Sequence, residues 1–133
     1  MKALTIRSFA KINLGLRVLG RRPDGYHDIH TTLQAIDLCD LLTFEQGSGL
    51  SLAVEGRYAV ACDASNLVMR AAKAMSELCP GRGAKITLRK EIPPGSGLGG
   101  GSSNAAVTLL ALDRLWGAGL QPAARLELAR SLG

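Results

Sequence analysis

A glycine-rich segment at residues 94–104, called the glycine loop below, constrains this chain more than any other part of its sequence. Five of the seven residues from 95 to 101 are glycine. Apolar alternation over residues 84–91 predicts a strand before the loop, and apolar residues three and four apart over 103–116 predict a helix after it. Glycines allow positive φ and close approach to a ligand, and the amides and dipole of a helix N-terminus attract phosphate. The sequence therefore predicts a phosphate-binding loop between a strand and a helix.

Three other interpretations of the glycine loop fit less well. The pattern G-x-x-x-x-G-K-[ST] does not match: Gly95 and Gly100 align with its two glycines, but the next residue is Gly101, where the pattern requires lysine. The dinucleotide pattern G-x-G-x-x-G matches Gly95, Gly97 and Gly100, but it opens a βαβ unit whose second strand ends in an acidic residue about 20 positions on. Here a second helix is predicted instead of that strand. A flexible connector rarely needs so many glycines at the start of a helix.

The N-terminal half is predicted to be rich in strands. Over residues 4–18 apolar side chains occupy even positions, which is typical of a strand or a pair of strands with one buried face. Lys11 and Asn13 then share the opposite face. An Asp-Gly turn predicts a loop over residues 21–28. Further strands are predicted near residues 31–36, 41–45 and 50–55. A hairpin turn at 46–49 would join the last two of these strands.

The C-terminal half is predicted to be mainly helical. A helix over 65–79, with Ser65 as its N-cap, precedes the strand at 84–91. Ser102 or Ser103 would cap the next helix, and a third helix runs from 122 to 133. The apolar side of the helix at 103–116 is expected to carry Ala106, Leu109, Leu110, Leu112 and Trp116. The apolar side of the helix at 122–133 is expected to carry Leu126, Ala129 and Leu132. Strands followed by helices indicate an α+β fold.

Composition narrows the class of protein. A chain of 133 residues supports about one domain. Its net charge of +5 favours an anionic partner, and phosphorylated small molecules suit it as well as nucleic acid does. Cys39, Cys62 and Cys79 lie far apart with no C-x-x-C pair, which indicates neither a disulfide framework nor a zinc site and favours a reduced cytoplasm. No stretch reaches the roughly 18 apolar residues of a membrane span, and no secretory signal is predicted.

The glycine loop resembles the second motif of the GHMP kinases, in which a proline precedes a Gly-Leu-Gly core and a pair of serines. The resemblance implies that the loop holds the phosphates of ATP, with Mg²⁺ as the accompanying ion. It also implies the GHMP kinase N-terminal fold, a mixed and mainly antiparallel sheet packed with helices, as in a ribosomal protein domain. The implied nucleotide-binding residues are Pro94, Gly95, Ser96, Gly97, Leu98, Gly99, Gly100, Gly101, Ser102, Ser103 and Asn104.

Residues 8–16 and 22–27 narrow the resemblance further. Together with the glycine loop they are similar to the branch of this superfamily that phosphorylates the 2-hydroxyl of 4-diphosphocytidyl-2-C-methyl-D-erythritol, in non-mevalonate isoprenoid synthesis. The resemblance implies that Lys11 is catalytic and orients the hydroxyl and the transferring phosphoryl group. It places Asn13 near the substrate hydroxyls. It implies that Tyr26 stacks on the cytosine and that His27 hydrogen-bonds to it. Ser102 is the implied metal ligand.

One departure from that family concerns the general base, an aspartate in a segment expected just after the third helix. The chain stops at Gly133, so the resemblance implies an N-terminal ATP-binding domain at 1–133 without the C-terminal domain and with little or no turnover by itself.

Two alternatives stay open. The first is a related GHMP kinase that acts on another alcohol. The second is an RNA-binding domain of similar fold, whose basic surface would use Arg17, Arg21, Arg22, Arg82, Lys85, Arg89 and Lys90. Against the second alternative, the chain has only five Phe, Trp and Tyr residues, and they do not alternate with basic clusters. We therefore expect a small-molecule substrate, with no nucleic acid and no membrane as partner.

Overall fold

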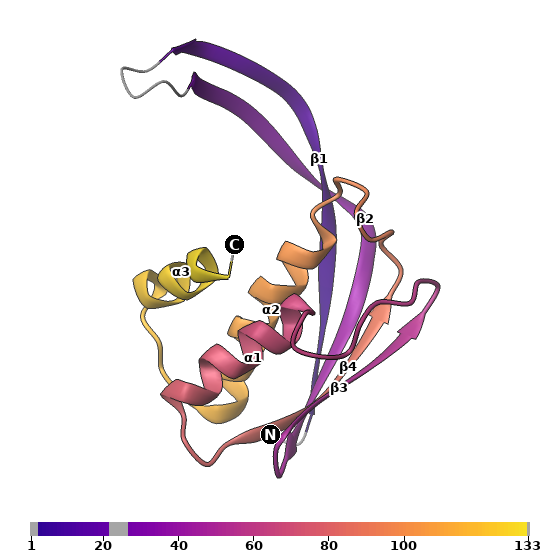
Figure 1. Cartoon of the computed structure of the whole chain (residues 1–133), viewed down its shortest axis with the longest axis vertical. Coiled ribbons are helices and arrows are strands. Elements are labelled where there is room, and N and C mark those ends of the chain that lie inside the picture. The colour runs from indigo at the N-terminus through magenta and orange to yellow at the C-terminus, as the bar shows by residue number, and fades with distance from the viewer. Residues whose placement is uncertain (1–2, 22–26, 133) are drawn as a thin grey trace.

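The computed structural model describes the backbone at residues 3–21 and 27–132, and the side chains at 3–14 and 33–132. A four-stranded sheet is packed with three helices, the α+β architecture that the sequence predicts (Figure 1). Its elements are β1 (Ala3–Arg21), β2 (His27–Gly47), β3 (Leu50–Gly56), α1 (Leu67–Leu78), β4 (Gly83–Lys90), α2 (Gly100–Trp116) and α3 (Pro122–Ser131). No helix in the described ranges is long and apolar enough to cross a bilayer.

The order of strands in the sheet is β1-β2-β4-β3, so the predicted hairpin at 46–49 is wrong. β4 lies between β2 and β3: Ile86 pairs with Phe44 on its antiparallel side and with Leu52 on its parallel side. Parallel strands need a long crossover connection, which α1 supplies between β3 and β4. The start of β4 fits there because Gly83 has no side chain. A Cβ on Gly83 would lie 2.6 Å from the Gly47 carbonyl oxygen.

β1 and β2 extend together beyond the rest of the sheet as a long arm (Figure 1). The segments 31–36 and 41–45, predicted as separate strands, both belong to β2. Three register shifts interrupt the pairing, the first between Phe9 and Lys11. The even-numbered face of β1 is covered as far as Ala10, but Leu14 is 59% exposed, against expectation. Leu33 on β2, close to Leu14, is 57% exposed as well, so apolar alternation does not lead to burial at the base of the arm.

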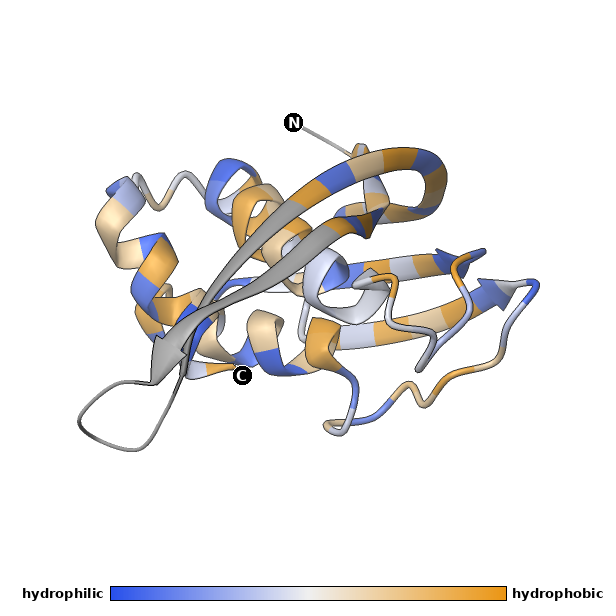
Figure 2. Ribbon diagram, turned by 90° about the horizontal axis from the view of Figure 1, so that it is seen from above, coloured by the Kyte–Doolittle hydropathy of each residue, from blue (hydrophilic) through white to orange (hydrophobic). Residues whose placement is uncertain are grey.

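The core lies between the sheet and the helices. Figure 2 shows hydrophobic and hydrophilic residues alternating along the strands, as a sheet with one covered face requires. The largest fully buried side chains of the core include Leu42, Phe44, Ile86 and Leu88 from the strands and Val68, Met75 and Leu112 from α1 and α2. Burying a side chain of this size stabilises the fold by about 1.5–3 kcal/mol.

The start of α1 differs by one residue from the prediction. Asn66, not Ser65, is the N-cap, and its side-chain oxygen accepts a hydrogen bond of 2.8 Å from the Val68 amide. The Ser65 hydroxyl instead donates to the Asp63 carboxylate. α1 ends at Leu78, ahead of the Pro-Gly pair, as predicted.

The start of α2 lies three residues earlier than predicted. Gly99 is its N-cap, with a φ of 72°, so Ser102 and Ser103 lie inside the first turn and cap nothing. Gly99 adopts a left-handed backbone and has no side chain to accept from the first amides of the helix. The buried face of α2 is also rotated from the predicted one: Leu109, Leu112 and Trp116 are buried as expected, but Ala106 and Leu110 are exposed. On α3, Leu126 is exposed as well.

Candidate functional site

The glycine loop joins β4 to α2, and its second half forms the first turn of that helix. Gly95, Gly97 and Gly99 all have positive φ, at 68°, 78° and 72°. Residues with a side chain rarely adopt this backbone, which explains the glycine spacing in the sequence. The Ser96 hydroxyl closes the first turn of the loop by donating to the Pro93 carbonyl at 2.7 Å. The loop thus has a defined compact shape.

The amides at the start of α2 are available to a ligand. Within the described chain, the amides of Gly100, Gly101 and Ser102 donate no hydrogen bond to a protein group; the first helical bond runs from the Ser103 amide to the Gly99 carbonyl at 3.0 Å. Gly101 and Ser102 are exposed, and a pocket of about 230 Å³ is lined by the loop. Such amides, with the positive end of the helix dipole, fit an anionic group such as phosphate.

Lys11 of β1 lies against this loop, 86 residues away in sequence. Its amide donates to the Leu98 carbonyl at 2.8 Å, and its ammonium group donates to the Gly97 carbonyl at 3.0 Å. This contact lies next to the register shift between Phe9 and Lys11, where Lys11 itself is paired with Ala35 of β2. The lysine stem also passes close to Gly99, where a Cβ would lie 2.8 Å from the Lys11 Cε.

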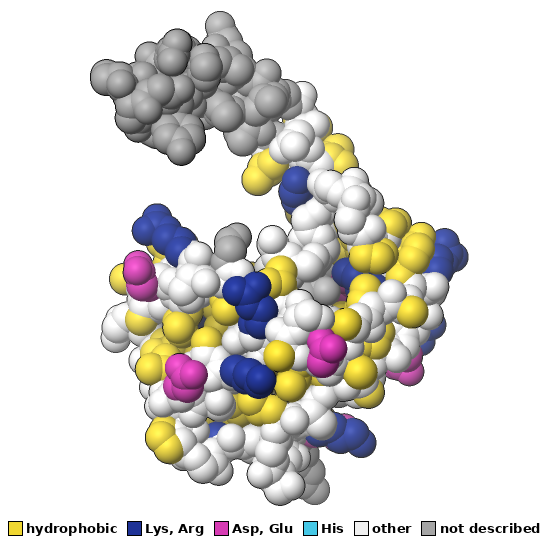
Figure 3. Space-filling model, in the orientation of Figure 1, with side chains coloured by type: hydrophobic (Ala, Val, Ile, Leu, Met, Phe, Trp, Pro, Cys, Tyr) yellow, Lys and Arg dark blue, Asp and Glu magenta, His cyan; other side chains and the backbone are white. Residues whose placement is uncertain are grey.

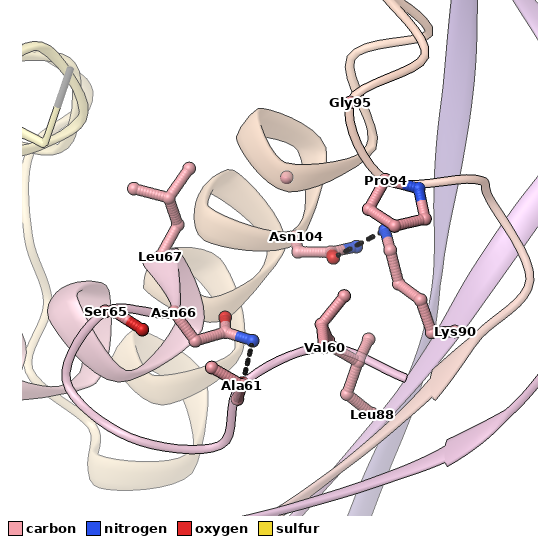
Figure 4. Close-up of a pocket in the computed structure, with 11 residues that line it drawn as sticks. Val60, Ala61, Ser65, Asn66, Leu67, Leu88, Lys90, Pro94, Gly95 and Asn104 are labelled. Atoms are coloured by element: carbon pink, nitrogen blue, oxygen red, sulfur yellow. Dashed lines mark hydrogen bonds between the residues drawn. The ribbon is translucent and has the colours of Figure 1, made fainter. Parts of the chain in front are cut away.

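A second pocket, of about 220 Å³, adjoins the glycine loop on the side of α1 (Figure 4). Its lining is mainly apolar, with Ser65, Asn66, Lys90 and Asn104 as the polar side chains. The Asn66 side-chain amide donates to the Ala61 carbonyl at 2.8 Å, which fixes its orientation. The full lining is Val60, Ala61, Ser65, Asn66, Leu67, Leu88, Lys90, Pro94, Gly95, Gly101 and Asn104. Sequence reasoning missed the residues before α1 here, because an irregular segment carries no periodic signal.

Below the loop lies a buried polar network that sequence reasoning also missed. The Lys90 ammonium group donates to the Asp40 carboxylate at 2.6 Å and to the Asn104 side-chain oxygen at 3.3 Å. The Asn104 side-chain amide donates to Asp40 at 2.9 Å and to the Ser8 hydroxyl at 2.8 Å. Lys90 is therefore not part of a basic surface. The available signal was an aspartate inside the apolar run 38–44.

The remaining predicted site residues are only partly described. Asn13 lies on β1 two positions after Lys11, exposed at the base of the arm. Tyr26 lies outside the described residues, and only the backbone of His27, paired with Arg21, is described. The Ser102 side chain is exposed in the first turn of α2. Across the described side chains, no group of three or more His, Cys, Asp or Glu could hold a metal ion.

Basic side chains do not gather into a single patch on the face shown in Figure 3, where they are dispersed among acidic ones. On this face, and for the side chains that the structure describes, the distribution differs from the continuous basic surface that nucleic-acid binding generally uses.

Residues 66–133 match the family described as GHMP kinases N terminal domain, and the chain belongs to this family. Two curated relatives named 4-diphosphocytidyl-2-C-methyl-D-erythritol kinase share 45% identity over 132 residues in Methylococcus capsulatus and 47% over 133 residues in Pelotomaculum thermopropionicum. Each alignment covers 98% of this chain but only 45% and 46% of the relative. The chain therefore spans just under half the length of these relatives.

Solved structures agree with the fold. A crystal structure of 4-(cytidine 5'-diphospho)-2C-methyl-D-erythritol kinase is 45% identical and superposes with a TM-score of 0.79, covering 98% of this chain and 46% of that one. Homoserine kinase from Cytophaga hutchinsonii, at 18% identity and a TM-score of 0.74 over 99% of this chain and 41% of that one, shares the fold alone.

Proposed function

We propose that this chain is the nucleotide-binding part of an ATP-dependent kinase that phosphorylates the 2-hydroxyl of 4-diphosphocytidyl-2-C-methyl-D-erythritol. The reaction belongs to non-mevalonate isoprenoid precursor synthesis, and we propose that it takes place in the cytoplasm. The observation that carries the proposal is the set of amides at Gly100, Gly101 and Ser102, which lie beside Lys11 and donate to no protein group. The printed names of relatives at 45% and 47% identity support the choice of substrate.

The two pockets beside the glycine loop suggest how a nucleotide would lie. They share Leu67, Pro94, Gly95 and Gly101, so a ligand can occupy both. The pocket against the loop amides suits the phosphates. The pocket of Figure 4 offers apolar walls and a few fixed polar groups, which suits a base. We propose that the base occupies this second pocket.

The chain's own residues would act by position and charge. Bound ATP would supply the phosphoryl group, and Mg²⁺ would neutralise part of the phosphate charge. The loop amides would orient the phosphates, with the exposed Ser102 hydroxyl as the proposed protein ligand of the ion. Lys11 would hold a positive charge beside the reacting hydroxyl. Asn13, Tyr26 and His27 would orient the substrate, as the family resemblance implies.

Calorimetric titration of ATP and Mg²⁺ into the 133-residue chain tests the nucleotide site. We expect binding of ATP, and about tenfold weaker binding by Lys11→Met, because a hydrogen bond to a charged group contributes about 1.5–3 kcal/mol. Lys73→Met, which changes an exposed lysine of α1 that lines neither pocket, is the matched control and should bind like the wild type. Equal affinity of the wild type for ATP and adenosine would contradict the proposal.

The substrate is tested separately. We expect a cytidine diphosphate alcohol to bind and homoserine or mevalonate to bind far more weakly. Tyr26→Ala should weaken only the cytidine compound, since stacking on a base contributes about 1–3 kcal/mol. Preferential binding of homoserine or mevalonate would favour a related GHMP kinase instead.

A further inference from the structure

Asp40 of β2 is a fully buried carboxylate that connects the two ends of the glycine loop. One of its oxygens accepts hydrogen bonds from the Glu91 amide at 2.7 Å and from the Ile92 amide at 2.8 Å, where the chain leaves β4 and enters the loop. The other oxygen accepts from Lys90 at 2.6 Å and from Asn104 at 2.9 Å, in the second turn of α2. One side chain thus holds both the entry and the exit of the loop.

A role in stability alone explains this arrangement poorly. Taking an aspartate and a lysine out of water is costly, and apolar residues of similar volume often stabilise a fold equally well or better. Asp40 and Lys90 are both buried, and every buried polar side-chain atom in the described part of the chain has a hydrogen-bond partner. The network therefore defines a single geometry at the cost of desolvation.

That geometry is transmitted directly to the amides that face the ligand. Gly100, the first residue of α2, rests on the network: a Cβ there would lie 2.9 Å from both the Lys90 Nζ and the Ile92 Cγ2. A shift of Lys90 or Ile92 toward Gly100 would therefore press on the first residue of the helix and change the direction of its free amides.

We propose that Asp40 is a positioning residue for phosphate binding. Together with Lys90 and Asn104 it forms a clamp that keeps the amides of residues 100–102 directed at the phosphates of a bound nucleotide. This inference rests on the proposed function. It adds a residue that touches neither pocket and acts through the backbone of the loop.

Asp40→Asn tests the clamp. Asparagine keeps one oxygen for the Glu91 and Ile92 amides but turns a donor toward Lys90 and Asn104, so the connection to α2 is broken. The measured quantity is the ratio of the affinities for ATP and adenosine, because adenosine lacks phosphates. We expect this ratio to fall by about tenfold or more, as small displacements of positioned groups reduce binding strongly. The affinity for adenosine should stay within about twofold of the wild type.

Asp113→Asn is the matched control. Asp113, like Asp40, is a buried aspartate. It lies near the C-terminal end of α2, where it accepts hydrogen bonds from the Leu120 amide and from the Arg125 side chain. Its loss should lower stability and leave the ATP-to-adenosine ratio unchanged. An equal fall of the ratio in both variants would overturn the proposal, because it would mean that any loss of a buried aspartate has the same effect.

A second variant keeps the test decisive if Asp40→Asn does not fold. The change Asn104→Ala removes the bond from α2 to Asp40 but leaves Asp40 its ion pair with Lys90 and its bonds from the Glu91 and Ile92 amides, so it is expected to preserve folding. The ratio should again fall by about tenfold or more. A folded Asn104→Ala variant with the wild-type ratio would overturn the clamp. By contrast, a wild-type chain that does not prefer ATP over adenosine would overturn the proposed function itself.

Discussion

At the scale of single residues, Gly97 and Gly99 share a left-handed backbone but differ in their surroundings. A Cβ on Gly97 would meet nothing within 4 Å, whereas one on Gly99 would lie 2.8 Å from the Lys11 Cε. Alanine at either position adds backbone strain of about 1–3 kcal/mol. Only Gly99→Ala also displaces Lys11. We expect it to bind ATP at least about tenfold more weakly than Gly97→Ala, measured by titration. Equal affinities would show that contact with Lys11 is unimportant.

A second prediction at this scale concerns acid stability. The hydroxyl and then the amide of Ser65 hold the pKa of the Asp63 carboxyl below its usual value of 3.8. A lowered pKa in the folded state stabilises the fold above the unfolded-state value, and the contribution is lost as pH falls through the folded-state pKa. In urea unfolding at a series of pH values, Ser65→Ala should be less stable than the wild type near pH 6. The difference should shrink below pH of about 4, and a constant difference would contradict this origin.

At the scale of elements, the cap of α1 gives a test that separates two neighbouring residues. Asn66→Ala removes the bond to the Val68 amide and should lower the free energy of unfolding by about 1 kcal/mol. Ser65→Ala removes only the exposed hydroxyl bond to Asp63, because the backbone amide of residue 65 can still donate, and it should have a smaller effect near neutral pH. Denaturant unfolding measures both. A larger effect of Ser65→Ala would favour the cap predicted from sequence over the one in the structure.

The strand order gives another test at this scale. Gly83→Ala would place a Cβ 2.6 Å from the Gly47 carbonyl oxygen and 2.7 Å from the Gly49 backbone. We expect it to lower the free energy of unfolding by about 1–3 kcal/mol, as overpacking does. Gly49→Ala is the control, since its Cβ meets nothing within 4 Å. If β2 and β3 formed a hairpin instead, Gly83 would lie at an edge and its substitution would be tolerated.

At the scale of the whole molecule, we expect the 133-residue chain to bind ATP without catalysing phosphoryl transfer at an appreciable rate. The family resemblance implies a general base in a segment that follows the third helix, and the curated relatives are more than twice as long as the aligned segment. The 133-residue chain should therefore bind ATP but release little or no ADP in a coupled assay with the cytidine substrate. A rate comparable with that of a full-length relative would contradict this.

The sequence by itself determined the local structure of the site. Positive φ among the closely spaced glycines and a helix start directly after them follow from residues adjacent in the chain, although the helix begins at Gly100 and not after a serine cap. The periodicity of α1 and the class of fold were predictable for the same reason. These properties depend on backbone preferences and apolar spacing within a few residues, which a sequence displays directly.

Only the tertiary structure decided the strand order and the surroundings of the loop. The turn at 46–49 is compatible with a hairpin, yet β4 lies between its strands, where Ile86 is fully buried and Gly83 leaves room for the neighbouring backbone. Asp40 reaches the loop across 51 and 52 residues, and Lys11 reaches it across 86. Such partners are chosen by burial and by the need to pair buried polar groups, and both depend on the whole packed chain.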